Sequence, residues 1–171
     1  MISINKKNRH LLYKYTPIIL LFISIMNEID FNLDFEYFSF NFAYILIFYY
    51  SLKREGSIGY ILIFIAGLFN DVVNGLPMGI SSLSYLLLCT AASYLRNITL
   101  RPNLFQDWIF FLFTVLVLNF ITFIYLMIFF NHEINYPDQI INIIGTFLLY
   151  LFFSNLFDYF EIYLLGRKNA R

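Results

Sequence analysis

The sequence predicts an all-α polytopic membrane protein with six transmembrane helices, organised as a single integral membrane domain over residues 1–171. Two observations predict this class. Hydrophobic residues make up 60% of the chain and charged residues only 13%, whereas an ordinary soluble domain carries about 25% charged residues. The apolar residues also form long runs that lack the alternation of transmembrane β-strands.

The predicted helices cover residues 11–29, 37–52, 57–73, 79–95, 108–130 and 139–164. The first apolar run follows a basic segment, as in a signal peptide. No small-residue cleavage site follows Met26, so we interpret the run as a retained helix. The third and fourth helices are the least clearly separated, because a polar stretch joins them.

The fifth predicted helix gives the strongest membrane signal, since no charged residue lies between Trp108 and Phe130. At about 1.5 Å per residue this segment extends about 34 Å, enough to cross a hydrocarbon core of roughly 30 Å. The sixth helix is longer than a bilayer requires. Its last part, 158–165, is expected to tilt or to lie in the inner interface.

The charged residues sort by side if six helices alternate in direction. All 11 Lys and Arg residues then lie on the side of the two termini: Lys6, Lys7, Arg9, Lys14, Lys53, Arg54, Arg96, Arg101, Arg167, Lys168 and Arg171. The other side holds Glu28, Asp30, Asp34, Glu36, Glu133 and Asp138, with Asp71 nearby. The positive-inside rule therefore predicts cytoplasmic N- and C-termini. The net charge of zero suggests no nucleic-acid partner.

The sequence shows no motif of a known catalytic or metal site. Cys89 is the single cysteine, and His10 and His132 lack the companions of a metal site. There is no H-E-x-x-H, no G-x-S-x-G and no phosphate-binding glycine loop, which disfavours a membrane protease. We therefore predict no catalytic residues, no metal and no cofactor.

A polar stretch between the third and fourth helices is the main candidate site. The candidate structural and docking motif comprises Gly67, Asn70, Asp71, Asn74, Gly75, Pro77 and Gly79. Its first four members recur at i, i+3, i+4 and i+7 and so share one helix face. Small and polar faces of membrane helices normally point at other helices. The last three members break the helix and turn the chain.

Asp71 has three possible roles. An ionisable residue at the edge of a membrane span is a functional candidate by default. Asp71 can cap a neighbouring helix end, provide a docking or gating site within the bundle, or act in catalysis. Ser81, Ser82 and Ser84 open the following helix and can satisfy freed backbone groups or cap it.

Other intramembrane polar residues are weaker candidates. Asn119 and Thr122 lie in the middle of the fifth helix and are expected to bond across to another helix. The sixth helix carries a similar small face, made of Asn142, Gly145 and Thr146.

Asp158 and Glu161 lie at i and i+3 near the end of the sixth helix. Paired carboxylates at this spacing can indicate acid–base chemistry. Their place near the interface, close to Arg167 and Lys168, favours a solvated interfacial pair instead.

From Phe42 to Leu100 the chain resembles the MreD family of bacterial rod-shape-determining membrane proteins. The matching segments read FYYSLKRE from Phe48 and GLFNDVVNGLPMGISSLSYLLL from Gly67. The family's hallmark pattern falls on Gly67, Leu68, Asp71, Gly75, Pro77, Gly79, Tyr94, Leu95 and Arg96. Chain length, six spans and inward termini fit the resemblance as well.

The resemblance implies a non-enzymatic component of the complex that builds lateral cell-wall peptidoglycan, located in the bacterial cytoplasmic (inner) membrane. The implied direct partner is MreC. MreB filaments and the transpeptidase–RodA synthase are implied members of the same complex. The resemblance also implies a fold similar to the substrate-binding subunits of energy-coupling-factor transporters.

Two other functions compete with this scaffold role. A small-molecule-binding membrane subunit of a vitamin-type transporter usually carries an alanine-rich stripe on its first helix, and residues 11–40 contain neither Ala nor Gly. An intramembrane enzyme is supported only by isolated carboxylates. The absent alanine stripe argues against the transporter.

Overall fold

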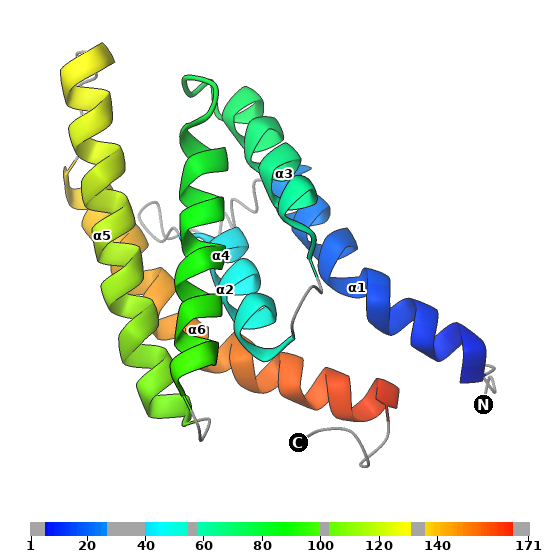
Figure 1. Ribbon diagram of the computed structural model, residues 1–171. Helices are drawn as coiled ribbons and strands as arrows, with labels where there is room; N and C mark the ends of the chain where they lie inside the picture. Colours follow the sequence, from blue (N-terminus) through cyan, green and yellow to red (C-terminus); the bar gives the residue numbers. More distant parts are fainter. Residues whose placement is uncertain (1–5, 27–39, 55–57, 100–102, 131–135, 166–171) are drawn as a thin grey trace, which may run out of the picture.

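The computed structural model describes residues 6–26, 40–54, 58–99, 103–130 and 136–165. These residues form six α-helices: α1 (Lys6–Met26), α2 (Phe42–Lys53), α3 (Tyr60–Val73), α4 (Ile80–Ile98), α5 (Leu104–Phe130) and α6 (Tyr136–Leu165). Figure 1 shows that the helices alternate in direction, so that α1 begins and α2, α4 and α6 end near the lower side of the bundle.

The predicted number of helices agrees with the described part of the chain, but several helix ends were wrong. α2 begins only at Phe42, because the Asn41 side chain caps it by accepting a hydrogen bond from the Tyr44 backbone N–H at 3.1 Å. α5 begins earlier than expected, at Leu104, where Asn103 accepts from the Phe105 N–H at 3.2 Å. Hydropathy misses such ends because polar capping residues, and not the ends of apolar runs, determine where these helices begin.

Some predictions fall outside the described residues. The expected ends of the first two helices, 27–29 and 37–39, are among them. So are His132, Glu133, Arg101, Arg167, Lys168, Arg171, Glu28, Asp30, Asp34 and Glu36, and the side chains of Lys6, Lys7, Arg9, His10 and Lys14.

α2 occupies the centre of the bundle. The other helices form a ring around it, in which α1 contacts α3, α3 contacts α4, α4 contacts α5, α5 contacts α6 and α6 contacts α1. All residues from Ala43 to Leu52 are buried. A helix that is apolar on every side is expected in such a position. The 12 residues of α2 extend about 18 Å, less than the roughly 30 Å of a hydrocarbon core.

Aromatic side chains fill the space around α2. Phe48 packs against Phe111 of α5 at a centroid distance of 5.0 Å and against Tyr150 of α6 at 5.8 Å. Trp108 of α5 stacks on Phe147 of α6 at 4.3 Å and donates its indole N–H to the Phe147 carbonyl at 2.9 Å. These contacts tie α5 and α6 to each other and to the central helix.

The outer surface of the bundle is strongly apolar. Exposed large hydrophobic side chains include Ile61 on α3, Phe113 on α5 and Leu148 on α6. Within the described residues, Leu104–Phe129 and Pro137–Ile162 are long and apolar enough to cross a membrane. Three shorter apolar helices cover Tyr15–Ile25, Phe42–Lys53 and Tyr60–Val73. The six membrane crossings therefore stay a prediction.

Candidate functional site

Asp71, at the end of α3, caps the beginning of α4. Its side chain is completely buried, and its two carboxylate oxygens accept hydrogen bonds from the backbone N–H groups of Gly79 at 2.7 Å and Ser81 at 2.8 Å. Gly79, the N-cap residue of α4, has no side chain to do this. The N-terminus of a helix has free N–H groups and favours negative charge. The geometry is that of a cap supplied by the preceding helix.

The glycines of the turn adopt backbone conformations that other residues rarely tolerate. Gly75 has φ +62° and Gly79 has φ +104°, both in the region that glycine enters without steric cost. Between them the Leu76 N–H donates to the Asp71 carbonyl at 2.9 Å, and Pro77 offers no N–H to continue the helix. The main chain of the turn is thus tied to Asp71 as well.

α3 and α4 touch through their backbones at Gly67. A Cβ atom on Gly67 would lie 2.3 Å from the Cα of Ser82. Beside this contact, Ser82 donates to the Phe64 carbonyl at 3.0 Å and Asn70 donates to the Ser81 hydroxyl at 2.9 Å. The predicted small and polar face of α3 therefore packs on the first turn of α4.

Asn74 is the member of the predicted motif that does not face α4. Its exposed side chain donates to the Asn70 carbonyl one turn back along α3, at 3.0 Å. Asn74 therefore caps the C-terminus of α3, because α3 ends at Val73 and its last carbonyl groups need hydrogen-bond donors.

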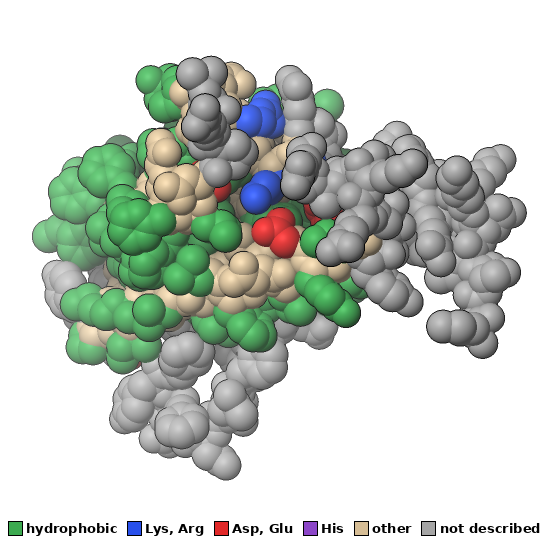
Figure 2. Space-filling view, turned by 90° about the horizontal axis from the view of Figure 1, so that it is seen from below, with side chains coloured by type: hydrophobic (Ala, Val, Ile, Leu, Met, Phe, Trp, Pro, Cys, Tyr) green, Lys and Arg blue, Asp and Glu red, His purple; other side chains and the backbone are tan. Residues whose placement is uncertain are grey.

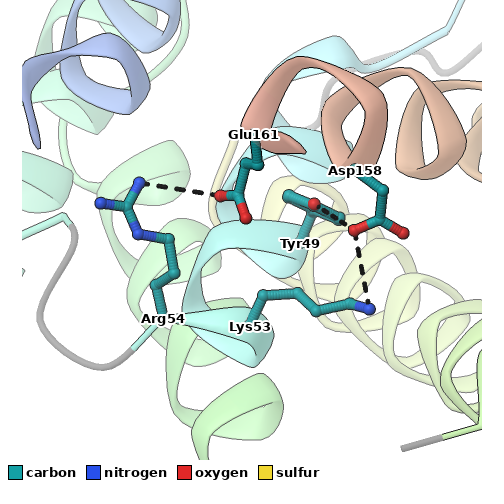
Figure 3. A network of polar contacts seen from close by, with 5 residues as sticks. All are labelled: Tyr49, Lys53, Arg54, Asp158 and Glu161. Atoms are coloured by element: carbon teal, nitrogen blue, oxygen red, sulfur yellow. Dashed lines mark hydrogen bonds and ion pairs between the residues drawn. The ribbon is translucent and has the colours of Figure 1, made fainter. Parts of the chain in front are cut away.

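A second polar cluster, which we term the α2–α6 junction, consists of Tyr49, Lys53, Arg54, Asp158 and Glu161 (Figure 3). The Tyr49 hydroxyl donates to Asp158 Oδ1 at 2.6 Å, and Lys53 Nζ lies 3.8 Å from the same oxygen. Arg54 Nη1 lies 3.8 Å from Glu161 Oε1. Seen from below, Lys and Arg side chains lie beside Asp and Glu side chains near the middle of a face on which many other described side chains are hydrophobic (Figure 2).

The junction corrects the prediction of a solvated pair at Asp158 and Glu161. Their side chains are only 35% and 16% exposed, and they face the end of α2. The predicted neighbours Arg167 and Lys168 lie outside the described residues. Sequence reasoning missed the α2 partners because more than 100 residues separate them from α6.

α6 also contacts the beginning of α2. The Asn41 backbone N–H donates to the Thr146 hydroxyl at 2.8 Å, and that hydroxyl donates in turn to the Asn142 carbonyl at 2.7 Å. The predicted small face of α6 is thus partly used to hold α2. α6 is bonded to both ends of the central helix.

The two mid-span candidates of α5, Asn119 and Thr122, behave differently from each other. Asn119 donates to the Val115 carbonyl of its own helix at 2.9 Å, and among the described residues the expected bond to another helix is not found. Thr122 does reach another helix, since its hydroxyl lies 3.4 Å from that of Ser84 on α4. An amide can bond back along its own helix when no partner lies opposite.

The chemistry of both clusters is that of structural contacts. Among the described residues, no group of three or more His, Cys, Asp and Glu side chains is placed to hold a metal ion. Both oxygens of the Asp71 carboxylate bind backbone N–H groups, and the carboxylates of the junction face Lys and Arg.

The helix bundle, its apolar surface and its inward-turned polar groups define an α-helical membrane protein. A model of the family described as "rod shape-determining protein MreD" matches residues 8–160, nearly the whole chain, and the chain belongs to this family. The family comprises membrane proteins with a role in determining rod shape and is not known for an enzymatic activity. No curated protein and no solved structure matched the chain.

Proposed function

We propose that the protein is a non-enzymatic scaffold and regulator of the rod (elongation) complex, which maintains cell shape by organising lateral peptidoglycan synthesis together with MreC. The observation that carries this proposal is the family match over residues 8–160. In this proposal the chain crosses the inner membrane six times, with both termini in the cytoplasm. MreB and the transpeptidase–RodA synthase belong to the same complex.

In the proposed mechanism, α3 and its Asp71 turn support the surface that receives the transmembrane helix of MreC. The backbone contact at Gly67 and the two Asp71 bonds support this role, because they hold α3 rigidly against α4. The opposite side of α3 is exposed and apolar, with Ile61 and Val72 pointing outward. An apolar helix face can pack against another helix within a bilayer.

The proposed function is tested by replacing the native MreD protein of a rod-shaped bacterium with this chain and by depleting it. Rounded cells on depletion and co-purification of MreC support the scaffold. Normal rods that have lost vitamin uptake would reject it in favour of a transporter subunit.

The docking surface is tested with two matched variants. Val72→Asn places an amide on the outer face of α3, and Ile128→Asn places one on the exposed face of α5. We expect Val72→Asn to lower the recovery of MreC at unchanged protein level, whereas Ile128→Asn leaves it unchanged. Equal recovery in both variants would place the docking surface elsewhere.

A further inference from the structure

A row of polar side chains winds along α6 through the interior of the bundle. Its members are spaced four residues apart: Asn142, Thr146, Tyr150, Ser154 and Asp158. Residues at i and i+4 are neighbours on a helix surface, and each step turns by about 40°, so the row winds partly around α6 while it extends about 24 Å along it. Thr146, Tyr150 and Ser154 are 0% exposed. The row crosses a core that is otherwise aromatic and aliphatic.

The two ends of the row have protein partners. Thr146 bonds to the Asn41 N–H and to the Asn142 carbonyl. Asp158 accepts from the Tyr49 hydroxyl and faces Lys53. Both ends therefore follow the rule that buried polar groups are hydrogen-bonded.

The middle of the row breaks this rule. The hydroxyl groups of Tyr150 and Ser154 lie near each other, but neither makes a hydrogen bond of good geometry among the described residues, although both side chains are completely buried. An unpaired buried hydroxyl is costly, and ordered water commonly satisfies groups that the protein leaves unpaired. Two such hydroxyls one helical turn apart offer a single water two bonding partners.

A carboxylate lies close to these hydroxyls. The Tyr150 ring stacks on Phe111 of α5 at 4.5 Å, and Asp107 lies one turn before Phe111 and is buried. Asp107 interacts electrostatically with Tyr150 and with Lys53. Charged and hydroxyl groups of α2, α5 and α6 thus extend from the interior to the partly exposed junction.

We propose that water binds inside the bundle at Tyr150 and Ser154, and that this water forms part of a hydrated seam along α6 that reaches the α2–α6 junction. The bound water supplies the hydrogen bonds that the two hydroxyls lack. It also extends the polar contacts of Asp107 toward Lys53 and Asp158.

The seam is tested first by removing the hydroxyls singly and together. If they bind water, Tyr150→Phe and Ser154→Ala each lower the apparent Tm by about 2–4 °C, and the double variant loses less than the sum, because both changes remove the same water. A direct bond between the two hydroxyls would give the same losses, and the second test separates it from bound water. If the hydroxyls are dry, their removal leaves the Tm unchanged or raises it, which would overturn the proposal. Thr146→Val is the control, since its hydroxyl has protein partners and its loss lowers the Tm in either case.

The second test observes the water directly. In uniformly ¹³C-labelled protein in liposomes, water-edited solid-state NMR measures how fast magnetisation passes from water to each side chain. Tyr150 should receive it faster than Ile63, which is equally buried among apolar groups, and Ser154→Val should slow the transfer to Tyr150. Equal rates for Tyr150 and Ile63 in the unaltered protein would show a dry interior.

Discussion

The α3–α4 turn and the α2–α6 junction both hold charge at a helix end, but they do so in different ways. In the turn, Asp71 binds N–H groups that lie 8 and 10 residues further along the chain, at 2.7 and 2.8 Å. In the junction, the Tyr49–Asp158 bond joins residues 109 positions apart, and both ion pairs measure 3.8 Å. The turn is a closed local unit, whereas the junction joins distant segments through one short hydrogen bond and two longer ion pairs.

This difference shows where the bundle is strong and where it can open. Short bonds from backbone N–H groups to a buried carboxylate are among the strongest hydrogen bonds. Ion pairs that are partly exposed and longer than a hydrogen bond contribute about 0–1 kcal/mol. Glu161 Oε1 even lacks a hydrogen-bond partner among the described residues. Local opening is therefore expected to separate α6 from α2 before it separates α3 from α4.

The largest expected effect is that of a side chain between α3 and α4. Gly67→Ala places a methyl group 2.3 Å from the Ser82 Cα, so the two helices must move apart, at a cost of about 3 kcal/mol or more. Thermal unfolding in detergent measures this loss. The matched control is Gly59→Ala, because a Cβ there meets nothing within 4 Å. Similar losses in both variants would refute the close packing of α3 on α4.

The next largest effect is expected at the cap. Asp71→Ala removes both acceptors and should lower the free energy of unfolding by about 2–4 kcal/mol, since two buried N–H groups lose their partner. Asp71→Asn keeps one acceptor and should retain protein level and cell shape. Immunoblots and cell images measure both. Loss of rod shape at a normal level of Asp71→Asn protein would contradict a purely capping role and favour docking.

A charge exchange tests the junction. Lys53→Glu sets two carboxylates against each other and should lower the free energy of unfolding by about 1–2 kcal/mol. The double change Lys53→Glu with Asp158→Lys restores opposite charges and should recover part of the loss. Denaturation of all four proteins gives the coupling energy. Strictly additive losses would mean that the pair does not interact.

The smallest expected effect is that of salt. Raising NaCl from about 0.1 M to about 0.5 M screens partly exposed pairs and should lower the Tm by roughly 1–3 °C. The double variant Lys53→Met, Arg54→Met removes the cations of the junction and should lose this response. Asp71→Asn should keep it, because the cap is buried. An unchanged salt response in the methionine variant would assign the effect to other charges.

The local features of the fold are accessible from the sequence. Glycine and proline spacing indicates the turn between α3 and α4, and the hydropathy runs indicate the number of helices. The capping role of Asp71 is among the roles the sequence allows, because its partners lie within ten residues. Such features depend on helix periodicity and turn chemistry, which act over short distances.

The sequence does not reveal features that depend on the packing of distant helices. The sequence of α2 from Ala43 to Leu52 is no more apolar than the sequence of α5. α2 is the central helix because the other five helices pack around it, and hydropathy does not reveal this packing. The partners of Asp158 and Glu161 cannot be found without knowing that α6 crosses the end of α2. Asn119 differs from these residues, because the sequence suggested a bond to a distant helix and its amide bonds within its own helix.

The short sequence separation of the Asp71 bonds has a consequence for membrane insertion during synthesis. In the predicted six-span topology, both partners of the carboxylate are present once Ser81 has been made, so α3 and α4 are able to insert as a pair when α4 is complete. The buried end of α2 has no such independence, because Asp158 is translated more than 100 residues later. A ribosome that stalls before α6 would leave a stable hairpin beside a central helix whose tyrosine and lysine still lack their carboxylate.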